Sequence, residues 1–64
     1  MARGECKKLV VEALKNWDYE REKASPFNIA MKIGYSESMV VKVLRELAYK
    51  GIVKKSPGGS WHLV

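Results

Sequence analysis

The chain has 64 residues, which is enough for one domain with a small core. Its composition, 47% hydrophobic and 30% charged, is typical of a folded globular protein and argues against disorder. The formal net charge is +5, and no apolar run approaches the roughly 20 residues of a membrane span, so we exclude a membrane protein.

The first predicted helix spans about residues 5–20, after a segment, 1–4, that we expect to be frayed. Its apolar residues recur at helical spacing and form one stripe that would cover the rest of the domain. The members of this stripe are Cys6, Leu9, Val10, Ala13, Leu14 and Trp17. The mixed-charge run 18–23 either extends this helix or leads out of it, and its interleaved signs favour a solvated connection over a metal site. Ala24 is a candidate for a short bridging strand.

A second helix is predicted over residues 26–33. Ser25 is a good N-cap, and Pro26 suits the first helical position. Gly34 supplies the positive φ that ends the helix, and Ala30 lets another helix cross at close range. These features predict a tight turn between two helices that share a small core.

A third helix is predicted over residues 37–50, with Ser36 as its N-cap and Gly51 as its stop. The segment 52–64 then has a β-branched run, a Pro-Gly turn and an alternating return strand, which together predict an antiparallel hairpin. The predicted core residues of the second and third helices and of the turn between them are Phe27, Ile29, Ile33, Tyr35, Val40, Val43, Leu44 and Leu47.

This order of elements, with its A-x-x-x-G spacing and the segment ELAYKGIVKKSPGGSWHLV, resembles the winged helix-turn-helix family of small transcriptional regulators. The resemblance implies a single domain, 1–64, of the α+β class, mainly helical, with three helices followed by a two-stranded wing. It also implies binding to double-stranded DNA, with helix 37–50 in the major groove. The wing, 54–60, would lie on the backbone or in a minor groove.

The basic residues favour the same partner, because residues 25–64 carry six basic against two acidic residues. Lys42 and Arg45 lie three apart on the third helix. An Arg there can donate a bidentate pair of hydrogen bonds to guanine, and a Lys can reach a base or a phosphate. The predicted DNA-binding residues are Lys32, Ser36, Ser38, Val41, Lys42, Arg45, Lys54, Lys55 and Ser56.

Met39 and Val41 leave an alternative open, because neither side chain can hydrogen-bond a base edge. A helix surface this apolar also fits RNA or protein contact within a larger complex. Winged-helix domains that bind left-handed nucleic acid have a similar Trp after the wing. That family relies on an Asn and a Tyr where this chain has Val41 and Arg45, and this difference argues against left-handed nucleic acid as the ligand.

The sequence predicts no enzyme, cofactor site or small-molecule site, because it has no nucleophile–His arrangement at credible spacing and no phosphate-cradling glycine loop. One cysteine, Cys6, and one histidine, His62, are too few for a zinc site.

Three further expectations concern the setting of the protein. We expect a cytoplasmic, nucleoid-associated protein of archaeal, bacterial or viral type, since no signal peptide opens the chain. The absence of Gln and Thr favours a thermophile. The favoured oligomer is a homodimer that reads a two-fold site through the first helix, at Val11 and Tyr19.

Overall fold

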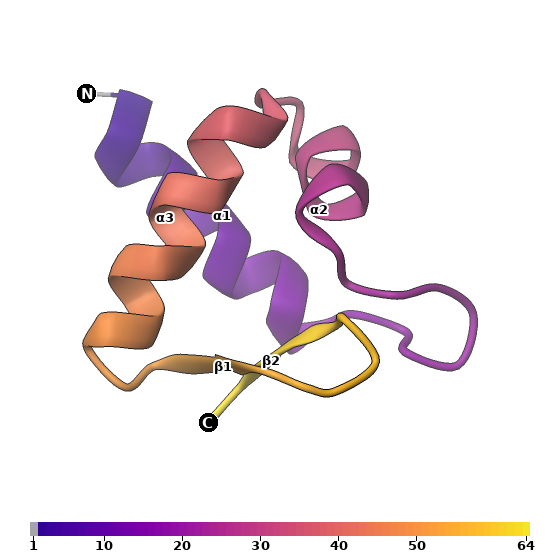
Figure 1. Cartoon of the computed structure of the whole chain (residues 1–64). Helices are drawn as coiled ribbons and strands as arrows, with labels where there is room; N and C mark the ends of the chain where they lie inside the picture. The colour runs from indigo at the N-terminus through magenta and orange to yellow at the C-terminus, as the bar shows by residue number, and fades with distance from the viewer. Residues whose placement is uncertain (1) are drawn as a thin grey trace.

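A computed structural model describes residues 2–64, with side chains from Gly4 onward. Three helices precede a two-stranded antiparallel hairpin, in the order α1 (Ala2–Lys15), α2 (Pro26–Ile33), α3 (Glu37–Tyr49), β1 (Val53–Lys55) and β2 (Trp61–Leu63). The helix α1 packs against both α2 and α3, and the hairpin lies beside the carboxyl ends of α1 and α3 (Figure 1). This arrangement confirms the predicted α+β fold and is consistent with a winged-helix layout. Within the described residues, every helix is too short or too polar to cross a bilayer.

The predicted stripe on α1 is largely confirmed. The helix begins at Ala2, so the segment predicted to be frayed is helical from that residue, and Met1 lies outside the described residues. Cys6, Val10 and Leu14 are buried at successive turns against the other two helices, whereas Leu9 is only half-buried.

The end of α1 differs from the prediction, because the helix stops at Lys15 rather than near residue 20. Trp17 turns into the core, where it is 8% exposed, and its indole N–H donates to the carbonyl of Glu22 at 2.8 Å. The carboxylate of Asp18 accepts from the backbone N–H of Glu20 at 3.2 Å. Such a local bond to an Asp side chain competes with continued helix, so the mixed-charge run forms a loop.

The predicted capping residues of the helix-turn-helix are confirmed. Ser25 accepts from the backbone N–H of Asn28 at 3.2 Å, and Pro26 begins α2. Gly34 ends α2 at φ 79°, in the left-handed region that favours glycine, and donates to the carbonyl of Ala30 at 2.8 Å. The turn therefore has the geometry that the sequence predicts.

The N-cap of α3 provides a first prediction. Ser36 accepts from the backbone N–H of Met39 at 3.2 Å. Replacing it by alanine leaves that N–H without its side-chain acceptor, so Ser36→Ala should lower the free energy of unfolding by about 1 kcal/mol. The measurement is urea denaturation followed by far-UV circular dichroism. Ser38→Ala is the matched control, since Ser38 is exposed and is not the cap; equal losses in both variants would contradict the capping role.

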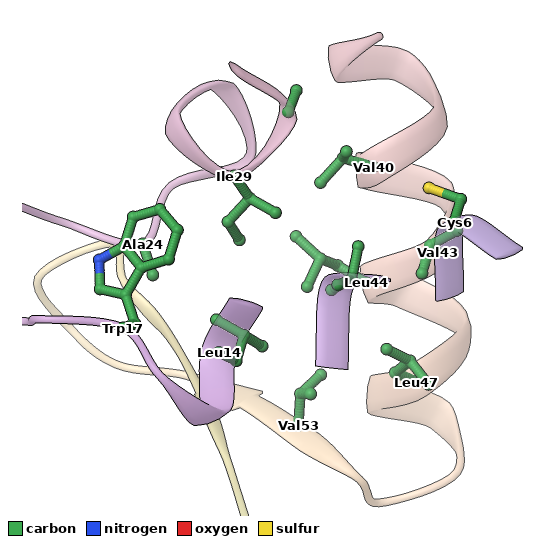
Figure 2. Close-up of a cluster of buried hydrophobic side chains, with 12 residues drawn as sticks. Cys6, Leu14, Trp17, Ala24, Ile29, Val40, Val43, Leu44, Leu47 and Val53 are labelled. Carbon is green, nitrogen blue, oxygen red and sulfur yellow. The ribbon is translucent and has the colours of Figure 1, made fainter. Parts of the chain in front are cut away.

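One hydrophobic core joins the three helices, the loop after α1 and the start of β1 (Figure 2). Its twelve buried residues are Cys6, Val10, Leu14, Trp17, Ala24, Ile29, Ala30, Val40, Val43, Leu44, Leu47 and Val53. The prediction of Phe27 as a core residue is wrong, because its side chain is 55% exposed. Ile29 and Ala30 occupy the inward positions of α2, which leaves Phe27 on the outer side of this short helix.

The hairpin is attached to the loop after α1. The backbone N–H of Trp61 donates to the carbonyl of Ala24 at 3.0 Å, and the hydroxyl of Tyr19 donates to the carbonyl of Trp61 at 2.8 Å. The ring of Tyr19 also stacks on His62, with centroids 4.3 Å apart. Ala24 thus pairs with β2 through one backbone bond but forms no strand. Because Tyr19 lies against the hairpin, and Val11 is half-buried against the core, neither is an exposed apolar residue for a homodimer.

Candidate nucleic-acid interface

The outer side of α3 carries a continuous line of exposed side chains. Ser38, Lys42 and Arg45 are four and three residues apart, so they lie on neighbouring turns of one helix face, and all three are exposed. Tyr49 follows four residues after Arg45 and is 93% exposed. We call these four residues the outer line of α3. It combines two cations, a hydroxyl and an aromatic ring on one solvent-facing surface.

The flank of α3 that faces α1 differs in character. Met39 is half-buried and packs against the core. It therefore does not belong to the outer line, although it was predicted from the sequence to be part of the helix surface. Glu46 lies 3.5 Å from the ammonium group of Lys7 on α1. The acid nearest in sequence to Arg45 is therefore paired across the helix interface and does not occupy the outer line.

The two wing lysines point to opposite faces of the hairpin. Lys55 is directly opposite Trp61, and Lys54 is directly opposite His62. Opposed residues of an antiparallel pair share a face, and successive residues of a strand alternate. Lys55 therefore shares a face with the buried Val53, whereas Lys54 lies on the face where Tyr19 stacks on His62. Both lysines were predicted from the sequence as DNA-binding residues, whereas the register of the hairpin places them on opposite faces.

A groove of about 490 Å³ lies between α3 and the hairpin, and we call it the α3–wing groove. Val41 of α3 and Trp61 of β2 contribute its apolar surface, with Pro26 at the start of α2, and the buried Leu44 lies beneath them. Its two charged lining residues are Arg45 and Lys55, both basic; Gly59 completes the lining. The groove thus places an apolar surface beside two positive charges.

The other predicted site residues lie elsewhere. The ammonium group of Lys32 is 3.7 Å from a carboxylate oxygen of Glu22 and 4.6 Å from the ring centroid of Trp17. Lys32 is therefore engaged at the loop after α1, and the structure does not bring it to the α3–wing groove. Ser36 is exposed but already serves as the cap of α3. Ser56 is half-buried at the wing turn, where its backbone N–H donates to the carbonyl of Ser60 at 2.8 Å.

Sequence reasoning missed two contributors to this surface. Tyr49 was not singled out, although its spacing of four from Arg45 and seven from Lys42 indicates the same helix face. Trp61 was not singled out as a site residue either; it packs against the core, and it also lines the groove. No signal in the sequence indicates this second role, because it depends on how the hairpin lies against α3.

Neither a reactive cysteine nor a group of metal-binding side chains is present among the described residues. Cys6 is fully buried, and burial raises the pKa of its thiol, which keeps it in the unreactive neutral form. No group of three or more His, Cys, Asp or Glu side chains in the described part of the chain lies in an arrangement that fits a metal ion.

Comparisons with protein-family models, with curated proteins and with solved structures found no match.

Proposed function

We propose that this chain is a winged helix-turn-helix domain that binds double-stranded DNA as a small transcriptional regulator. In this proposal α3 enters the major groove with its outer line toward the bases, and the wing, residues 54–60, lies on the backbone or in a minor groove. The proposal includes a cytoplasmic, nucleoid-associated location in an archaeal, bacterial or viral system, and a homodimer on a two-fold site.

One observation carries the proposal: Lys42 and Arg45 lie exposed on one face of α3, and Lys55 borders the groove beside them. The nearby acid Glu46 is held by Lys7 on the side of α1. A helix surface with exposed cations suits a polyanion, and the neighbouring wing extends that surface. A duplex offers both a groove for the helix and phosphates for the wing.

The salt dependence of binding tests the electrostatic part of the proposal. Four exposed cations, Lys42, Arg45, Lys54 and Lys55, lie on α3 and the wing. Each neutralised phosphate contributes about 0.9 to the slope of log K against log[salt], so two to four contacts predict a slope of roughly −2 to −4. Fluorescence anisotropy with a labelled duplex, measured at several salt concentrations, gives this slope.

The matched control for that titration is Lys15→Gln, since Lys15 is exposed at the end of α1, outside α3 and the wing. It should leave the slope unchanged. A slope between 0 and about −1 for the unmodified chain would contradict the proposed surface. The stoichiometry of the saturated complex in sedimentation distinguishes a dimer on the site from a monomer.

A second candidate function is contact with RNA or with a protein, and the apolar surface of α2 favours it. Phe27 and Met31 are 55% and 69% exposed and lie one helical turn apart. A selection of bound sequences from random duplex DNA, run beside single-stranded RNA, separates these functions. Enrichment of RNA alone would reject the duplex proposal. A protein partner that is lost with Phe27→Ala and Met31→Ala would support the second function.

A further inference from the structure

The α3–wing groove has a chemical character that narrows what can occupy it. Its apolar surface is formed by Val41 and Trp61 over the buried Leu44, and its charged lining residues, Arg45 and Lys55, are both basic. Its volume is about 490 Å³. An occupant that suits this lining has an apolar surface beside a negative charge.

The register of the hairpin determines which wing lysine serves this groove. Lys55 and Trp61 are directly opposed, so their Cβ atoms are expected to lie roughly 4.5–5.5 Å apart on one face. The aliphatic stem of Lys55 can then follow the indole while its ammonium group stays at the rim of the groove, because lysine keeps its charge in water. Lys54 projects from the other face, beside His62.

We propose that the α3–wing groove holds the sugar–phosphate backbone of one DNA strand, the strand that borders the major groove occupied by α3. Deoxyribose rings pack against Val41 and Trp61, and a phosphate binds the ammonium group of Lys55. Lys54 contacts no phosphate of this strand, so one wing lysine, not two, binds the backbone. Arg45, on both the outer line and the groove, stays directed to the base edges.

A deoxyribose–phosphate strand is the occupant that the lining favours. The sugar presents C–H groups to an apolar surface, whereas each phosphate needs a cation within reach. An acidic peptide carries its charges on flexible side chains and needs partners for its backbone N–H groups, which Val41, Leu44 and Trp61 do not offer. This inference rests on the proposed function, because it assigns a part of the duplex to a part of the same surface.

The first test compares Lys55→Gln with Lys54→Gln, two neighbouring exposed residues that lose the same charge. Lys55→Gln should make the salt slope of duplex binding shallower by about 0.9, which corresponds to roughly eightfold weaker binding at 0.1 M salt when affinities converge at 1 M. Lys54→Gln should change the slope by less than about 0.3 and the affinity by less than about twofold. Thermal melts of both variants should match the unmodified protein, because neither residue is buried.

The second test uses the two indole N–H resonances of the chain as reporters. The indole N–H of Trp17 donates to Glu22, whereas that of Trp61 has no hydrogen-bond acceptor among the described residues. In a ¹⁵N-labelled sample titrated with a short duplex, the Trp61 indole signal should move with saturation, and the Trp17 signal should stay in place. Trp17 thus serves as the internal control, since it lies in the core near Lys32 and is not among the residues that line the groove.

The outcomes separate this inference from the proposed function. Equal slope changes in the two lysine variants, a larger change for Lys54→Gln, or a saturating duplex that leaves the Trp61 signal unmoved would overturn the groove assignment. In each of those cases the domain still binds duplex DNA, and the proposed function survives. A chain that binds no duplex at any salt concentration overturns both. Single-stranded RNA that moves the Trp61 signal at lower concentration than duplex DNA also overturns the assignment.

Discussion

Ile29→Ala should unfold a large fraction of the protein at 37 °C. Ile29 is fully buried where α2 meets the core, and truncating such a side chain costs about 2–5 kcal/mol in lost burial and residual cavity. A domain near this size rarely gains more than about 3–5 kcal/mol from its core, so the loss approaches the whole free energy of unfolding. Each kcal/mol lowers the midpoint by roughly 4–8 °C, which thermal denaturation followed by circular dichroism measures directly.

Met31→Ala is the matched control for this prediction, since it truncates an apolar side chain on the same helix. Met31 is 69% exposed, so its loss should change the free energy of unfolding by less than about 0.5 kcal/mol. Equal destabilisation in both variants would contradict the orientation of α2, with Ile29 inward and Met31 outward.

Arg45→Ala should reduce affinity for the preferred duplex by about 1–3 kcal/mol, or roughly five- to 150-fold, and relax the sequence preference. Arg45 is exposed on the outer line of α3, where its guanidinium can donate two hydrogen bonds to a guanine. Competition titrations with the selected site and with single-base variants measure both effects. The thermal midpoint should barely move, because Arg45 contributes nothing to the buried core.

The matched control is Arg21→Ala, which removes the same charged group from the loop after α1. Arg21 lies with Asp18, Glu22 and Lys32 around a hollow of mixed charge. None of these four residues belongs to α3 or to the wing. Arg21→Ala should leave the preference among sites intact and change affinity little. If Arg45→Ala retains full discrimination between sites, α3 does not read bases through this residue.

One pair of variants tests the packing of the core, and the other tests the binding surface. The Ile29 and Met31 variants test which side of α2 faces the core, and the Arg45 and Arg21 variants test which cation reads the partner. The two sets are independent, because the outer line of α3 lies on the side of the helix away from its buried Val40, Val43, Leu44 and Leu47. A change in binding without a change in melting can therefore be assigned to the surface.

The local signals in the sequence were sufficient for the elements and their order. Ser25, Gly34 and Ser36 act through hydrogen bonds and φ angles within a few residues, so their effect is readable without the tertiary structure. The apolar spacing on α3 likewise placed Val40, Val43, Leu44 and Leu47 in the core, because a helix of 13 residues has one clear inward side. The cations of the outer line follow from the same periodicity.

Where the sequence prediction failed, contacts between distant segments decided the outcome. The first helix ends at Lys15 because Trp17 is drawn into a core that also contains Ala24 and Ile29. Phe27 is exposed because a helix of eight residues inserts only part of one side, and Ile29 and Ala30 occupy it. Local propensity does not indicate either result.

The sequence alone determined that this chain has three helices, the second and third of them capped, and a hairpin, with positive charge concentrated in its second part, because caps, periodicity and charge are local properties. Only the tertiary structure decided how that charge is distributed. The pairing of Lys55 with Trp61, and the position of the hairpin beside α3, set one wing lysine at the groove and the other on the opposite face. The physical reason is that a strand alternates its side chains, so the partner strand and the helix beside it determine where each lysine lies.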